Sequence, residues 1–126
     1  MTQAETLIKV IKQQAEVFLL DAHEFYPFGT AIDKENNIIP LAAAIEAEND
    51  RPESQPLIDK LDNHILNGIK NGEYIIGGSA YDILMNKNQE KFDAMLIRVY
   101  ENDRFVERFF KYYIHEDKVK FFEIEP

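Results

Sequence analysis

The chain has 126 residues, of which 45% are hydrophobic, and this composition predicts one globular domain that spans residues 1–126. With 23 acidic residues against 14 basic ones the formal net charge is −9, which repels the phosphates of nucleic acids and of membranes, so we expect neither as a partner. The sequence holds no cysteine, no secretion signal and no long apolar run, which excludes disulfides and thiolate chemistry and favours a cytoplasmic protein.

An amphipathic helix is predicted at the start of the chain. Thr2 and Glu5 have the spacing of a capping box, in which each side chain accepts a hydrogen bond from the backbone amide of the other residue. We expect this helix to end near Leu20 or Asp21. An apolar stripe recurs at helical spacing and is formed by Leu7, Val10, Ile11, Ala15, Phe18 and Leu19.

Two strands should follow this helix. The first runs to about Ile32, and the second covers residues 38–45 after a polar turn. Pro27 and Pro40 indicate an edge or an irregularity in each strand, because proline cannot donate a ladder hydrogen bond. Residues 46–53 predict an acidic, solvated loop.

A second helix and four more strands complete the chain. The helix should begin around residues 54–56 and end near Lys70, because Gly72 just beyond suits a helix stop. Gly77 and Gly78 indicate a bulge or a place where another group approaches the backbone closely. The four predicted strands are Tyr74–Leu84, Lys91–Glu101, Arg104–Ile114 and Val119–Ile124.

The last third of the chain predicts its own strand pairing. If Asn102 and Asp103 form a two-residue turn, the flanking strands match charges and rings in one register, and a slip of one residue would exchange the faces. The same register sets Tyr112 opposite Asp93. The predicted pairs are Glu101 with Arg104, Tyr100 with Phe105, Val99 with Val106, Arg98 with Glu107, Leu96 with Phe109 and Phe92 with Tyr113.

The element order α-β-β-α-β-β-β-β with short loops predicts an antiparallel sheet of five or six strands. Two amphipathic helices on one face of that sheet would complete a two-layer α+β domain. The sheet face that carries Met95, Ile97 and Phe110 is mostly apolar and should pack under the helices.

The opposite face of the hairpin mixes aromatic rings with charges, and a solvated sheet face is usually more polar. Two interpretations stay open. A second copy or another protein covers this face, or the rings and the charged stems shield one another in water. The first interpretation predicts an interface formed by Phe92, Leu96, Arg98, Tyr100, Phe105, Glu107, Phe109, Lys111 and Tyr113.

The sequence shows no motif for catalysis or for binding a cofactor or metal. His23, His64 and His115 fall in three separate elements without the spacing of metal ligands, and we expect structural or solvated roles for them. No cofactor and no metal are therefore expected.

The acid–base candidates are Glu24, Asp82 and Asp93. A carboxylate on a buried face can have a raised pKa and transfer protons, but more often it accepts a structural hydrogen bond. For Asp93 the expected structural partner is Tyr112. The alternative to an interaction protein is a small-molecule-binding protein or an enzyme, with a pocket near Tyr26, His64 and Asp93.

Two resemblances accompany this reading. The segment Glu24-Phe25-Tyr26-Pro27-Phe28-Gly29 after the first helix resembles small uncharacterised bacterial proteins, which implies no activity. The first elements are also similar in order to roadblock and profilin-like domains, which are mostly adaptors and dimerise, although this chain ends in strands. We therefore predict a non-enzymatic protein-interaction module, an adaptor or an immunity-type protein, with a protein partner or a second copy.

Overall fold

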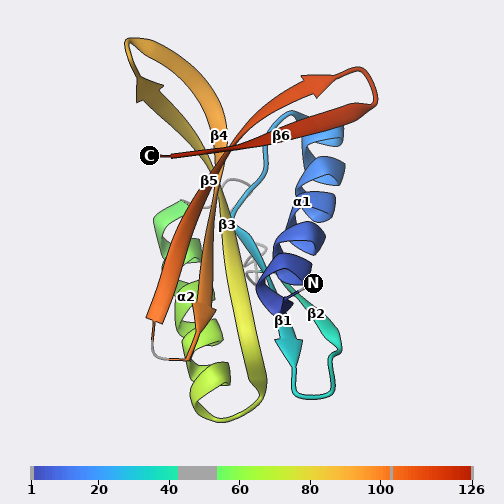
Figure 1. Cartoon of the computed structure of the whole chain (residues 1–126), viewed down its shortest axis with the longest axis vertical. Helices are drawn as coiled ribbons and strands as arrows, with labels where there is room; N and C mark the ends of the chain where they lie inside the picture. The colour runs from blue at the N-terminus through green and yellow to red at the C-terminus, as the bar shows by residue number, and fades with distance from the viewer. Residues whose placement is uncertain (1, 43–53, 103, 126) are drawn as a thin grey trace.

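A computed structural model describes residues 2–42, 54–102 and 104–125. It has two helices and a six-stranded antiparallel sheet with the strand order β2-β1-β3-β4-β5-β6 (Figure 1). The predicted α+β class and the element order are confirmed. The elements are α1 (Gln3–Ala22), β1 (Phe28–Asp33), β2 (Ile38–Ala42), α2 (Ser54–Lys70), β3 (Tyr74–Lys87), β4 (Glu90–Glu101), β5 (Arg104–His115) and β6 (Lys118–Ile124).

The predicted helix ends are confirmed. Thr2 is the N-cap of α1, and both hydrogen bonds of the capping box with Glu5 are present. Helix α2 ends in a Schellman motif, in which Gly72 has a φ of 82° and the Glu73 N–H donates to the Gly68 carbonyl at 2.8 Å. The left-handed conformation explains why glycine follows the last turn of α2.

The predicted register of the β4–β5 hairpin is also confirmed. All the predicted pairs from Glu101 with Arg104 to Leu96 with Phe109 are formed, and the ladder continues to Ala94 with Lys111. The expected pair of Phe92 with Tyr113 lies just beyond that last pair. Residues 43–45 of the second predicted strand, the acidic loop 46–53 and the turn residue Asp103 lie outside the described residues.

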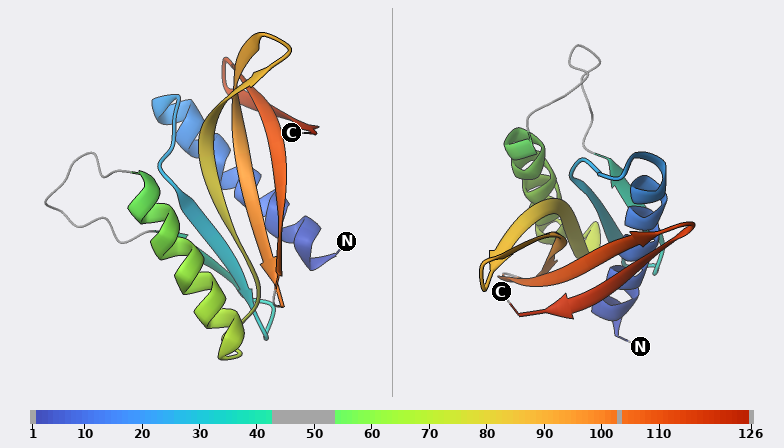
Figure 2. Two further views of the ribbon diagram at one scale, coloured as in Figure 1. Left: turned by 90° about the vertical axis from the view of Figure 1, so that its left-hand side faces the viewer. Right: turned by 90° about the horizontal axis from the view of Figure 1, so that it is seen from above.

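The helices lie on opposite faces of the sheet, whereas the sequence predicted both on one face. A Cβ atom built on Gly77 would lie 2.7 Å from the side chain of Ile65 in α2, and one built on Gly78 would lie 3.0 Å from Ile11 in α1. Neighbouring residues of a strand point to opposite faces, so β3 separates the two helices. Figure 2 shows α2 in front of the sheet and α1 behind it.

The glycine pair thus marks a close approach rather than a bulge, because the ladder between β3 and β4 runs through both residues without a shift. Each helix buries its own cluster of apolar side chains. The α1 side includes Leu7, Ile11, Ile76, Ile97 and Phe110. The α2 side includes Ala31, Leu61, Ile65, Tyr74 and Tyr100.

Strand β6, at one edge of the sheet, contacts α1. The backbone N–H of Val119 in β6 donates to the carboxylate of Glu16 in α1 at 2.9 Å. The β5–β6 hairpin passes across α1 in the second view of Figure 2. Neither described helix has the length and apolarity that a membrane span requires.

Candidate binding face

Helix α2 covers only part of its side of the sheet. It packs on β3, β1 and the nearest part of β4, while the strands continue beyond its end (Figure 2). We call the α2-side surface of β4, β5 and β6 that α2 leaves uncovered the outer face. The register assigns to it Glu90, Phe92, Leu96, Phe105, Glu107, Phe109, Lys111, Tyr113, His115, Lys118, Lys120, Phe122 and Ile124.

Aromatic rings on the outer face are half exposed. The exposed fractions of Tyr113 and Phe122 are both 50%, and Phe105 is similarly accessible. The Tyr113 and Phe122 rings meet edge to face, with centroids 5.7 Å apart. Aromatic pairs prefer this arrangement, which favours the observed orientation of both rings.

Lys111 contacts two rings and a carboxylate of the outer face. Its Nζ atom lies 4.5 Å from the centroid of the Phe92 ring and 5.3 Å from that of Tyr113. The same atom lies 3.2 Å from the Glu90 carboxylate. Side-chain hydrogen bonds with Tyr113 and Glu90 raise the pKa of Lys111, so the cation is retained at neutral pH. Rings and charged stems therefore shield one another in part, yet a wide aromatic surface stays accessible.

Two of the nine predicted interface residues contact the α2 side of the core instead. Tyr100 is 3% exposed and lies in the cluster under α2. Arg98 is held between Asp62 of α2 at 2.7 Å and Glu107 at 3.0 Å. The prediction missed this because it placed both helices on the other face. The seven remaining residues line the strands beyond α2, with Glu107 engaged by Arg98.

A buried polar network under α2 escaped the sequence analysis. The Asp62 carboxylate accepts hydrogen bonds from Ser79 at 3.0 Å, from Tyr81 at 2.8 Å and from Arg98 at 2.7 Å. Ser79 is fully buried and also lies 2.5 Å from the Tyr81 hydroxyl. Burial raises the pKa of Tyr81 far above its usual value and that of Tyr100 to about 12, so both hydroxyls stay protonated.

The signal for this network was present in the sequence. Asp62 falls within the apolar stripe of α2, and Ser79 and Tyr81 alternate on one face of β3. A carboxylate in an apolar stripe needs hydrogen-bond partners on the surface that it faces. The network holds α2 on the sheet and gives the outer face a fixed boundary.

Asp82, one of the acid–base candidates, belongs to a second hydrogen-bond network. Tyr112 donates to Asp82 at 2.8 Å instead of to the predicted partner Asp93, which is exposed. Burial raises the pKa of Asp82, and the charges of Asp93 and Glu24 add to the shift. The Phe25 backbone also hydrogen-bonds to Asp82, so this carboxylate fastens the α1–β1 link to the sheet.

The alternative pocket near Tyr26, His64 and Asp93 is not assembled. His64 lies 2.8 Å from the hydroxyl of Tyr74, the first residue of β3. Asp93 pairs with Leu84, ten residues further along the same strand. At about 3.3 Å per residue, the two sites lie roughly 33 Å apart along the strand. The prediction that these three side chains share a pocket was wrong.

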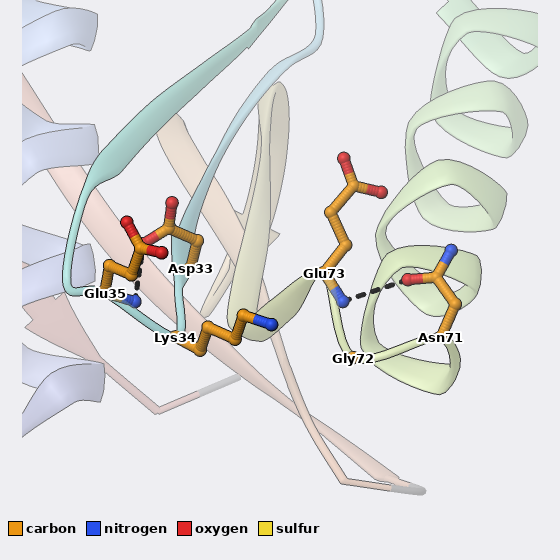
Figure 3. A pocket seen from close by; sticks show the side chains of 6 residues that line it. All are labelled: Asp33, Lys34, Glu35, Asn71, Gly72 and Glu73. Atoms are coloured by element: carbon orange, nitrogen blue, oxygen red, sulfur yellow. Dashed lines mark hydrogen bonds between the residues drawn. The ribbon is translucent and has the colours of Figure 1, made fainter.

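A shallow pocket lies between the β1–β2 turn and the α2–β3 turn (Figure 3). Its polar groups complete the turns, since Asp33 accepts the N–H of Asn37 at 2.8 Å and Asn71 accepts the N–H of Glu73 at 3.0 Å. The hydrogen bond from Asn37 lowers the pKa of Asp33. Across the described parts of the chain, no group of three His, Asp or Glu residues is placed to hold a metal ion.

No protein-family model, curated protein or solved structure matches the chain. The resemblances to small bacterial proteins and to roadblock and profilin-like domains therefore stay predictions. The functional argument depends on the geometry of the outer face.

Proposed function

We propose that this protein is a non-enzymatic interaction module, an adaptor or an immunity-type protein, that binds another protein through its outer face. The observation that carries the proposal is the half-exposed aromatic surface around Tyr113 and Phe122. Aromatic side chains are enriched at the centres of protein interfaces, where they bury a large area at a small cost in side-chain entropy. The proposal includes a cytoplasmic location, which the lack of cysteine in the sequence favours.

The two edges of the sheet support contact through a face rather than through an edge. Strand β2 carries Pro40, which offers no N–H to an added strand. At the other edge, Glu16 of α1 occupies the N–H of Val119 in β6. Both devices disfavour the addition of a partner's strand.

The pattern of titratable groups supports binding rather than catalysis. The carboxylates with buried partners, Asp62 and Asp82, accept hydrogen bonds that fasten α2 and the α1–β1 link. Both carboxylates lie away from the outer face, and the Asp62 network touches that face only where Arg98 pairs with Glu107. A partner can therefore cover the outer face without disturbing the contacts that hold the fold together.

Affinity capture with matched variants tests the proposal. The tagged chain, a Tyr113→Ser/Phe122→Ser variant and a Val17→Ser/Leu84→Ser control are incubated with extract of the source cells. Val17 and Leu84 are 66% and 67% exposed and lie on α1 and on the other side of β3, so the control removes apolar surface elsewhere. We expect one protein to be retained by the wild type and the control and lost from the outer-face variant.

Circular dichroism melts establish that all three chains are folded to the same extent. The proposal fails if no retained protein depends on Tyr113 and Phe122, or if the control loses the same protein. A metabolite bound to the purified chain in native mass spectrometry, without any protein partner, would favour the small-molecule alternative.

A further inference from the structure

On the basis of the proposed function, we infer that the partner presents an acidic surface to the outer face. Lys118 and Lys120 are exposed at the end of this face, and Lys120 pairs across the strands with Tyr113. Directly paired residues share a face, so these cations lie beside the accessible rings. An acidic partner surface with apolar side chains would match both features.

The acidic side chains of this face are already paired. Glu90 lies 3.2 Å from Lys111, and Glu107 lies 3.0 Å from Arg98. In the described part of the chain, no ion pair is formed by Lys118 or Lys120, and Glu116 and Asp117 lie in the turn beyond the strands. The outer face therefore carries unpaired positive charge on a protein whose net charge is −9.

This charge distribution disfavours a second copy as the occupant. In a symmetric dimer the same patch meets itself, and the carboxylates of that patch are already held by Lys111 and Arg98. Apart from Glu116 and Asp117, which lie in the turn beyond the strands, Lys118 and Lys120 would find no free carboxylate in the described part of that patch on the facing copy. Binding to another, more acidic face of a second copy would be head to tail and would give a ring or an open chain of subunits rather than a symmetric dimer.

A nucleic acid would also be anionic and would stack on aromatic rings, but it is disfavoured for a different reason. Its phosphates extend along the strand beyond any single patch and would meet the strongly acidic remainder of this protein. A protein can confine its acidic residues to the area of contact. Electrostatic complementarity of that local kind sets the partner choice and the rate of association.

The test uses the full, isotope-labelled chain and defined probes. The first probe is a short peptide that alternates Asp or Glu with Leu and Phe. In the second each acid is replaced by Lys, in the third each acid is replaced by Gln, and the fourth is single-stranded oligothymidylate. Binding is followed by amide chemical shifts, which report whether β4, β5 and β6 are the strands affected.

We expect the acidic peptide to bind to these strands more tightly than the other probes, with an affinity that falls as salt is added. Lys118→Glu/Lys120→Glu should weaken it about tenfold, and Lys118→Gln/Lys120→Gln should weaken it less. The control Lys9→Glu/Lys34→Glu, which reverses two exposed lysines elsewhere, should leave the affinity within about twofold.

Three results would overturn the inference. The acidic peptide fails to shift β4–β6 amides, the charge-reversed variant binds it as well as the wild type does, or oligothymidylate binds more tightly. If the Gln or Lys peptide binds these strands in its place, the inference fails while the proposed function stands. Loss of the captured protein from the Tyr113→Ser/Phe122→Ser variant tests the proposed function independently.

Discussion

Asp62 illustrates how a single residue fastens a helix to this sheet. Its carboxylate accepts hydrogen bonds from Ser79, Tyr81 and Arg98, and its side chain is 14% exposed. Asp62→Ala leaves these donors under α2 without their acceptor. We expect the free energy of unfolding to fall by about 2–3 kcal/mol in urea titrations. Asn63→Ala, at an exposed position of the same helix, should change it by less than about 0.5 kcal/mol.

A loss for Asp62→Ala no larger than that of the Asn63 control would contradict this role. Arg98 also contributes through its pair with Glu107, so the Asp62 variant keeps the cross-strand ion pair. Retention of the β4–β5 register in the variant would separate the loss of helix anchoring from damage to the hairpin.

The raised pKa of Asp82 predicts how the stability of the fold depends on pH. Burial raises its pKa in the folded state, so the folded state binds this proton more tightly than the unfolded chain does. The stability that the proton supplies is present below the usual Asp range and is lost as the pH rises through the folded-state pKa. The melting temperature of Asp82→Asn minus that of the wild type should therefore increase as the pH is raised from about pH 3 to about pH 7.

Subtraction of the wild-type curve removes the contributions of most other carboxylates to the pH dependence. Glu24 and Asp93, whose charges act on Asp82, remain coupled to it. A difference in melting temperature that is flat, or that moves against the variant with rising pH, would show that the Asp82 pKa is not raised.

At the scale of elements, Gly77 and Gly78 set the distance of the two helices from β3. A methyl group on Gly77 would press on the buried Ile65, while one on Gly78 would meet the ends of Leu7 and Ile11 at 3.1 and 3.0 Å. Flexible side-chain ends can move aside, so Gly77→Ala should cost more than Gly78→Ala.

We expect Gly77→Ala to lower the free energy of unfolding by about 1–3 kcal/mol, which outweighs the gain from replacing a strand glycine. Leu84→Ala, at an exposed position of the same strand, serves as the control and should change stability by less than about 0.5 kcal/mol. Stabilisation by Gly77→Ala in denaturant titrations would mean that α2 lies further from β3 than described.

The comparison of sequence and structure also belongs at this scale. The β4–β5 register was predictable because charge and ring pairs such as Arg98 with Glu107 agree in one alignment. The face of the sheet that α2 covers could not be predicted, because the small residues Gly77 and Gly78 allow a helix to pack on either face of β3. Because α2 was placed on the wrong face, Tyr100 was assigned to an interface. The hydrogen bond between Asp62 and Ser79 joins residues 17 positions apart, so it could be predicted only after α2 had been assigned to the correct face.

For the whole molecule, the unpaired cations of the outer face predict a monomer. Sedimentation equilibrium of the purified chain should give the mass of one chain across the accessible concentration range. The carboxylates on the outer-face strands, Glu90 and Glu107, are already paired, and those of Glu116 and Asp117 lie in the turn beyond the strands. A compact dimer that dissociates in the Tyr113→Ser/Phe122→Ser variant would contradict this prediction. It would show that a second copy, and not an acidic partner, covers the outer face.

The central claim is that the rings of β5 and β6 meet a partner protein, and photo-crosslinking in the source cells tests it most directly. A photoreactive phenylalanine analogue replaces Phe122 on the outer face or, as the control, Val17 on α1, at positions with exposed fractions of 50% and 66%. We predict one discrete crosslinked species from position 122 that is missing from position 17. No crosslinked protein at position 122, or the same products from both positions, would contradict the claim.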